Sequence, residues 1–346
     1  MTVFLLIILL LCLWKIKIAK PFPFGFNENY LSHDRTDCIK GVFVLLVFLS
    51  HSRNYLLEYS EYLAAPLNSI YNVIQEHLGQ SIVVMFLFYS GFGVMESIKR
   101  KGNVYINSFP KNRFAKTLFN FDVAVLLFIF VDLCIGTLKN YSTLHIILSF
   151  TGWESVGNSN WYIFAVLIMY LITYTAFKIF NKQYTKALVL ITVLTVLYIG
   201  LLALVKDAWW FDTVLLYPLG MWYSSGKDKI ENFVRKNGLL IFIVAVFTVS
   251  HVFRKNIICY EISQVAFCAV ILAVTMKIDI SNKILKFLGK HLFEFYILMR
   301  IPMIILLHYQ VTDTYLFVCV SFAATIIMSV FLKKFLSILD GKIFSK

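Results

Sequence analysis

One apolar stretch of the sequence holds a basic residue and a histidine eleven residues apart, Lys40 and His51. In a helix this spacing covers about three turns, or roughly 16 Å, so both side chains point to nearly the same side. A histidine that faces a water-filled cavity is suited to act as a general base, because the pKa of imidazole lies near neutrality. The alternative is a structural histidine that is hydrogen-bonded to a neighbouring helix.

Clustered cations near the next apolar stretch could bind an anionic ligand. Lys99, Arg100 and Lys101 follow one another, and Arg113 and Lys116 stand in the loop that comes next. If that loop opens a helix, Arg113 and Lys116 share a face and can grip phosphates at the membrane surface. Taken as charges alone, they are more often the anchors that mark cytoplasmic loops.

Charged residues also fall inside the apolar stretches, where an ionisable group is costly and is therefore a candidate site. Asp37 stands at the start of the stretch that holds Lys40, and Glu261 and Arg300 lie in later ones. An arginine inside a membrane usually pairs with an acid, and Glu261, on the preceding stretch, is the partner we expect for Arg300. Structural pairing is a more common role for such residues than substrate contact.

The elements that position these residues are apolar helices. The chain has 346 residues, of which 60% are hydrophobic and only 15% charged, a composition that excludes a soluble domain. Runs near the roughly 20 apolar residues needed to cross a bilayer recur along it. We predict an all-α fold, a polytopic integral membrane helical bundle of about 10–11 transmembrane segments. The apolar segments are residues 2–19, 38–57, 79–98, 117–138, 161–180, 186–205, 212–224, 238–253, 257–276, 291–309 and 314–333.

The placement of positive charge predicts how these segments are oriented. With the N-terminus outside and the C-terminus inside, nearly all of the 32 Lys and Arg residues fall on the inner side. The exceptions are Arg53, Lys139, Lys206, Arg254 and Lys255 in outer loops, and Arg300 within a segment. This bias is typical of cytoplasmic loops. The net charge of +13 therefore indicates contact with membrane lipid and not with nucleic acid.

Two parts are expected along the chain. Residues 1–20 form an N-terminal membrane anchor, because the lysines follow its apolar stretch, whereas a signal peptide carries them in front. Residues 35–340 form one membrane domain without a long soluble loop. The six cysteines include no CxxC pair, so neither a zinc site nor a disulfide framework is predicted.

The order of the motifs resembles acyltransferase family 3, the membrane-embedded acyltransferases that modify cell-surface sugars and related acceptors. The matching residues are Lys40 with His51, Phe86 to Phe92, Arg113 with Lys116, Asn160 to Tyr162, Tyr217 to Met221, and Leu288 to Pro302. Lys40 and Lys116 stand where the family commonly has arginine, so the bidentate fork is lost there. Arg300 stands where a histidine is often found. These departures leave the donor preference open.

The resemblance implies that residues 35–340 are an acyltransferase domain of a multi-pass protein in the bacterial cytoplasmic membrane. It implies transfer of an acyl group, most often acetyl, from cytoplasmic acyl-CoA to a hydroxyl of an extracytoplasmic polysaccharide or lipid-linked glycan. In such a reaction His51 is the general base, and Lys40 lies nearer the cytoplasmic side on the same helix. Ser90 could donate a hydrogen bond to the oxyanion. The inner cations Arg113, Lys116, Lys99 and Arg100 then bind the phosphates of acetyl-CoA, and no metal takes part.

Two other classes of protein share many spans and buried charges. A transporter or flippase of lipid-linked sugars is the first alternative, although it does not need a basic residue and a histidine at a fixed spacing. A glycan polymerase is the second, and it normally carries a longer polar outer loop. The oligomeric state is left open, a homo-oligomer included.

Overall fold

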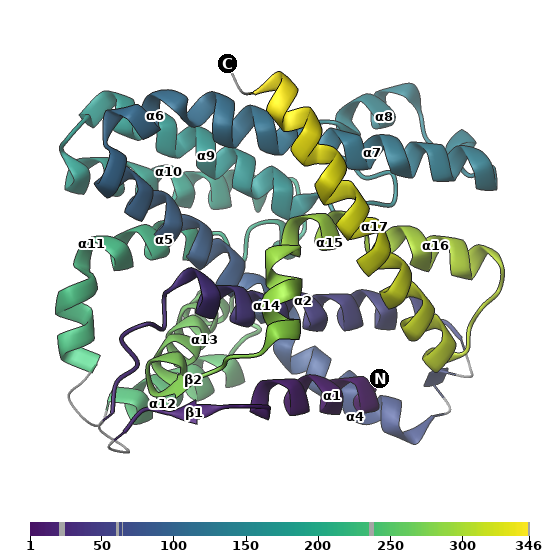
Figure 1. Ribbon diagram of the computed structural model, residues 1–346, viewed down its shortest axis with the longest axis horizontal. Coiled ribbons are helices and arrows are strands. Elements are labelled where there is room, and N and C mark those ends of the chain that lie inside the picture. Colours follow the sequence, from purple (N-terminus) through teal and green to yellow (C-terminus); the bar gives the residue numbers. More distant parts are fainter. Residues whose placement is uncertain (21–24, 60–61, 64, 235–238, 345–346) are drawn as a thin grey trace.

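The computed structural model describes residues 1–20, 25–59, 62–63, 65–234 and 239–344 (Figure 1). Helices account for 80% of the structure, which confirms the predicted all-α class. The elements in chain order are α1 (Thr2–Leu13), β1 (Lys17–Ile18), α2 (His33–Leu56), α4 (Pro66–Leu78), the 3-10 helix η1 (Gly79–Val83), α5 (Val84–Lys101), α6 (Asn103–Phe109), the π-helix η2 (Pro110–Ala115), α7 (Lys116–Ile135), η3 (Leu138–Asn140), α8 (Thr143–Ser149), α9 (Trp161–Phe180), α10 (Tyr184–Leu202), η4 (Ala208–Trp210), α11 (Leu216–Val234), α12 (Leu239–Val252), α13 (Ile257–Lys277), β2 (Ile278–Asp279), α14 (Lys283–Lys290), α15 (Leu292–Leu298), α16 (Arg300–His308) and α17 (Thr314–Ile343).

Six helical stretches among the described residues are long and apolar enough to cross a bilayer. A seventh is gained if α14 and the following α15–α16, which are bent by 68° relative to each other, count as one span. This count is lower than the 10–11 segments expected, because α1 and α12 are short and α2 and α11 carry charged residues that lower their hydropathy. The six stretches are residues 66–101, 103–135, 161–180, 184–202, 257–277 and 314–343.

The surface of these helices is apolar in the way that a lipid environment requires. Phe130 on α7, Leu197 on α10 and Phe331 on α17 are each more than half exposed, as are many of their neighbours. A soluble monomer rarely exposes contiguous apolar surface on this scale. The exposed faces therefore indicate contact with acyl chains, in agreement with the predicted membrane bundle.

Two glycines bring α14 directly onto α2. A Cβ atom at Gly41 of α2 would overlap the carbonyl of Leu285, and one at Gly289 of α14 would overlap the carbonyl of Asp37. In Figure 1, α14 runs across α2 at the centre of the molecule. Only small residues allow backbones to approach this closely. This crossing fixes the start of α2, the helix that carries both Lys40 and His51.

A second pair of glycines joins α5 to α11 in the same way. A Cβ at Gly91 would overlap the carbonyl of Tyr217, and one at Gly220 would overlap the carbonyl of Phe88. The absence of side chains at these glycines therefore allows the two helices to pack closely. Both crossings involve motifs that carry the family resemblance, so part of that resemblance reflects helix packing.

The segment after α1 is tied to the segment after α13. Strand β1 pairs antiparallel with β2, with Lys17 opposite Asp279 and Ile18 opposite Ile278. The guanidinium of Arg35, in the first turns of α2, contacts the Asp279 carboxylate at 2.7 Å. These contacts hold the start of α2 from a second direction.

Candidate functional site

His51 lines a cavity of about 590 Å³ at the C-terminal half of α2, which we call the His51 cavity. Val47, Ser50, His51 and Asn54 line it from successive turns of α2. These four residues follow the spacing of one helix face. Other walls come from α4, η1, α13, α15 and the loop before α11, so elements distant in sequence enclose the imidazole.

The imidazole of His51 is hydrogen-bonded to no other residue that the structure describes. Beside it, Gln75 donates to the Ser50 hydroxyl at 2.8 Å, so the neighbouring polar groups satisfy each other. The structural alternative requires a hydrogen bond between His51 and a neighbouring helix, and the described residues do not form one. An imidazole in a cavity without such a bond keeps a ring nitrogen available for a substrate proton.

Lys40 lines a second cavity, of about 470 Å³, at the N-terminal half of α2, which we call the Lys40 cavity. Helix α5 lines it with Tyr89, Gly93, Ser97 and Arg100, which recur every three or four residues. From Tyr89 to Arg100 this strip is about 16 Å long. On α5 the lining residues run from Arg100, near the C-terminal end of the helix, back to Tyr89, and on α2 Lys40 is the lining residue farthest from the start of the helix.

The two cavities lie on one face of α2 and are separated by a layer of apolar side chains. The deepest lining residues on α2 are Lys40 for one cavity and Val47 for the other, about 10 Å apart along the helix. Within this interval Phe43 is buried and packs edge-on against Phe86, with ring centroids 6.4 Å apart. Phe86 in turn contacts the ring of Tyr162 at 6.2 Å. A cation-lined cavity and a histidine-lined cavity thus meet end to end across an aromatic layer.

The comparison with known proteins decides the family. The family model described as an acyltransferase domain, that of acyltransferase family 3, matches residues 33–334 and so covers nearly the whole chain. The chain belongs to acyltransferase family 3. It is a multi-pass membrane acyltransferase. No curated protein and no solved structure matches it significantly.

In this acyltransferase, Lys40 and Lys99 both have acidic partners on their own helices. The Lys40 ammonium contacts the Asp37 carboxylate at 2.9 Å, three residues earlier on α2. The Lys99 ammonium contacts Glu96 at 2.5 Å and donates to the carbonyl of Ser224 at 2.8 Å. Lys99 therefore also joins α5 to α11, whereas Lys40 stays on the cavity wall.

The predicted pair of Arg113 and Lys116 is not brought into one cavity. Arg113 donates to the hydroxyl of Tyr105 at 2.8 Å and points among tyrosines. The Lys116 ammonium contacts the Asp340 carboxylate of α17 at 2.7 Å and lines a different cavity, between α7, α15 and α17. Neither residue lines the Lys40 cavity. Arg100 does line it, so Arg100 is the cation of the predicted set that joins Lys40 there.

The expected ion pair between Arg300 and Glu261 is not formed. Arg300 donates to the Tyr55 hydroxyl at 3.0 Å and to the carbonyl of Asn158 at 3.1 Å, and its charge lies near His51. Both carboxylate oxygens of Glu261 are buried without a hydrogen-bond partner among the described residues. Arg300 begins α16, beyond the bend between α14 and α15, whereas Glu261 lies on α13. The predicted pairing was therefore wrong.

Ser90 stands next to the second glycine crossing and is half-buried. It lines neither the His51 cavity nor the Lys40 cavity. Its role as an oxyanion donor stays a prediction without a geometric argument. Groups that do line the His51 cavity, and that the sequence pattern did not single out, are Gln75, Asp212 and Tyr296.

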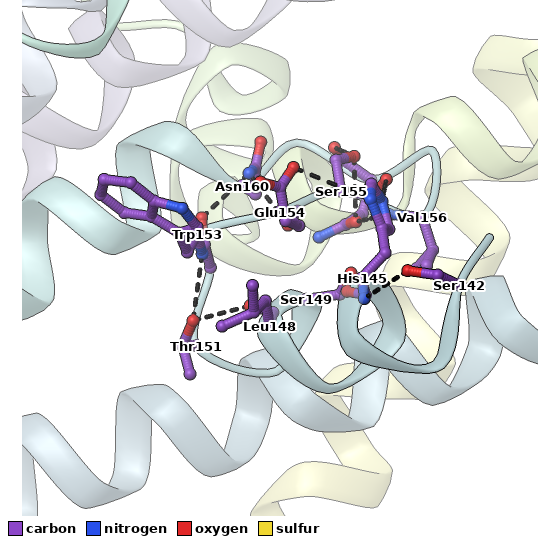
Figure 2. A network of polar contacts seen from close by, with 12 residues as sticks. Ser142, His145, Leu148, Ser149, Thr151, Trp153, Glu154, Ser155, Val156 and Asn160 are labelled. Carbon is purple, nitrogen blue, oxygen red and sulfur yellow. Dashed lines mark hydrogen bonds and ion pairs between the residues drawn. The ribbon is translucent and has the colours of Figure 1, made fainter. Parts of the chain in front are cut away.

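The loop between α8 and α9 is held by a network of polar contacts (Figure 2). A ring nitrogen of His145 lies 2.9 Å from the carbonyl of Ser155. The Lys206 ammonium lies over the rings of Trp153, at 4.2 Å, and of Trp210, at 4.5 Å. Such cation–π contacts are attractive and directional. The loop leads into α9, whose first residue lines the His51 cavity, so this network fixes one wall of that cavity.

Proposed function

We propose that this acyltransferase transfers an acyl group, acetyl in the first instance, from cytoplasmic acyl-CoA to a hydroxyl group of an extracytoplasmic glycan. The observation that carries the proposal is the end-to-end pair of cavities on one face of α2. The Lys40 cavity faces the cytoplasm in the orientation predicted by the basic loops, and it would receive the donor. The His51 cavity then opens on the opposite side and would receive the glycan hydroxyl.

The proposed step is direct transfer with His51 as general base. The imidazole takes the proton of the acceptor hydroxyl while the hydroxyl oxygen attacks the carbonyl carbon of the thioester. The tetrahedral intermediate collapses with cleavage of the carbon–sulfur bond, and the leaving thiolate takes the proton from the imidazolium. The products are an ester of the glycan and free CoA. Positioned general-base catalysis contributes typically about 10²–10⁴-fold to such a rate.

The aromatic layer gives this reaction a spatial order. A donor in the Lys40 cavity and a base in the His51 cavity are separated by the contact between Phe43 and Phe86. The thioester end of the donor must pass these rings to meet the acceptor, so side-chain rotation in the layer is part of the proposal. When the rings do not rotate, the layer keeps water in the His51 cavity away from the thioester. This separation protects the donor from hydrolysis.

Family membership favours acyl transfer over the alternative function, a transporter or flippase of lipid-linked sugars. A flippase needs a passage wide enough for a sugar headgroup between the two sides. The apolar layer between the cavities is built from buried aromatic side chains, which suits a slender pantetheine arm better. Acetyl-CoA and the glycan are therefore the donor and acceptor classes that we would test first.

The direct test compares surface glycans from cells with and without the gene by mass spectrometry. We expect the glycan of the deleted strain to lose one acetyl unit per modified residue. Purified protein in proteoliposomes should then transfer label from acetyl-CoA supplied on the cytoplasmic face. An unchanged set of glycan masses, together with no label transfer, would contradict the proposed function.

The donor-binding cations can be separated by substitution. Arg100→Gln is expected to raise the KM for acetyl-CoA about tenfold, because a charged hydrogen bond to a phosphate is worth about 1.5 kcal/mol. Lys116→Gln is the matched variant, since Lys116 lines another cavity and pairs with Asp340. We expect the KM of that variant to stay within about twofold of the wild-type value. A larger increase in KM for Lys116→Gln than for Arg100→Gln would contradict binding of the donor in the Lys40 cavity.

A further inference from the structure

One buried tyrosine of the Lys40 cavity has a hydroxyl group without a partner. Tyr89 of α5 is only 8% exposed, and its hydroxyl makes no hydrogen bond with any residue that the structure describes. A buried polar group in this state is rare and calls for an explanation, because its desolvation is not compensated. A hydroxyl can donate one hydrogen bond and accept two, so a ligand with a carbonyl or an amide would satisfy it.

The position of Tyr89 in the cavity indicates which part of a ligand it would meet. On α5 the lining residues run from Arg100, near the helix end, to Tyr89, about 16 Å deeper. On α2 the lining residue farthest from the start of the helix is Lys40, about 10 Å along it. A donor whose phosphates bind near Arg100 would therefore extend its pantetheine arm along this strip, with the amide and thioester carbonyls towards Tyr89.

We propose that Tyr89 is a donor-positioning residue, whose hydroxyl donates a hydrogen bond to a carbonyl of the pantetheine–thioester arm. The inference rests on the proposed function, because it takes acyl-CoA as the donor. Binding of the arm gives the hydroxyl the partner that it lacks, and a small movement of the ring towards the cavity breaks no protein hydrogen bond. Since Tyr89 lies on the cavity side of the aromatic layer, it would hold the thioester directly below the Phe43–Phe86 contact.

The chain offers a matched control for this inference. Tyr198 of α10 is also 8% exposed, and its hydroxyl also lacks a partner among the described residues. It lines neither the Lys40 cavity nor the His51 cavity. Tyr89→Phe and Tyr198→Phe therefore remove the same group from equally buried sites, and only the first removes it from the proposed donor path.

The experiment measures binding of two donors to purified protein by isothermal titration calorimetry. The probes are acetyl-CoA and S-acetylpantetheine, which keeps the arm but lacks the nucleotide. Tyr89→Phe is expected to weaken both about fivefold, the effect of one neutral hydrogen bond. Tyr198→Phe should bind both as the wild type does, and Arg100→Gln should lose affinity for acetyl-CoA only. A purely structural role for Tyr89 would not produce this pattern across the two donors.

The outcomes separate the inference from the proposed function. Wild-type binding of acetyl-CoA with unchanged affinities in Tyr89→Phe would overturn the role of Tyr89 and leave the donor assignment standing. An equal loss in Tyr198→Phe would also overturn it, because the effect would then not depend on the cavity. If the wild-type protein binds neither donor, the proposed donor class is contradicted, and the role of Tyr89 falls with it.

Discussion

Replacing His51 with alanine is expected to abolish acyl transfer while the protein remains folded in the membrane. The imidazole is the base of the proposed reaction, and its loss removes about 10²–10⁴-fold of rate. The side chain lines a cavity and has no hydrogen bond to another described residue, so its truncation breaks no structural contact of that kind. Transfer of label from acetyl-CoA to the glycan, measured at saturating donor, should fall to the background rate.

The matched control is His308→Ala. His308 ends α16 and is exposed, away from the His51 cavity, so this variant should transfer label at the wild-type rate. Donor binding by His51→Ala should also be unchanged, because His51 lies on the other side of the aromatic layer from the Lys40 cavity. Full transfer by His51→Ala would remove this residue from the mechanism and would leave the His51 cavity without a candidate base.

The sequence predicted those features that depend on position along a single helix. Lys40 and His51 were expected on one side of their helix, and both line cavities on one face of α2. Family membership and the all-α class were predicted and are confirmed. Gly91 and Gly220 each meet a backbone carbonyl of the other helix, and it is the small size of glycine that permits this contact. Helical periodicity and residue size are local properties, so a single sequence is enough to read them.

The position of Arg113 relative to Lys116 could not be predicted in the same way. Their spacing places both on one face only if the helix is a regular α-helix. The structure has a π-helix over residues 110–115, immediately before Lys116. A π-helical turn holds more residues than an α-helical turn, so it rotates the following side chains away from the expected face. Arg113 consequently faces tyrosines, and Lys116 faces α17.

The sequence also could not predict which side chains pair across the bundle. The choice of Glu261 for Arg300 followed from charge and from adjacency of segments, but Arg300 lies beyond a bend of 68° between α14 and α15, which a pattern of charges does not predict. Its partners became the hydroxyl of Tyr55 and a backbone carbonyl. Neither carries a charge that a sequence pattern would single out. The Tyr89 hydroxyl differs from Arg300, because what distinguishes it is that it has no hydrogen-bond partner among the described residues.

Gly91→Ala is expected to prevent stable folding, although it adds only one methyl group. The new Cβ would overlap the carbonyl oxygen of Tyr217, a backbone atom that cannot rotate away. Helices α5 and α11 would have to separate, and overpacking typically costs about 1–3 kcal/mol, with the upper end expected here because the clash is with backbone. Since α5 lines the Lys40 cavity, its displacement would also remove donor binding. The yield of monodisperse protein in detergent and its melting temperature should both fall sharply.

Gly93→Ala, two residues further along the same helix, separates this steric effect from the intrinsic preferences of glycine. A Cβ at Gly93 meets no atom within 4 Å, so the substitution adds no clash. Alanine favours the helix over glycine by up to about 1 kcal/mol, so the melting temperature of Gly93→Ala should equal or exceed that of the wild type. If Gly91→Ala melts as Gly93→Ala does, the two helices are not in backbone contact at this point. The cavity wall would then depend on side chains and not on the glycine crossing.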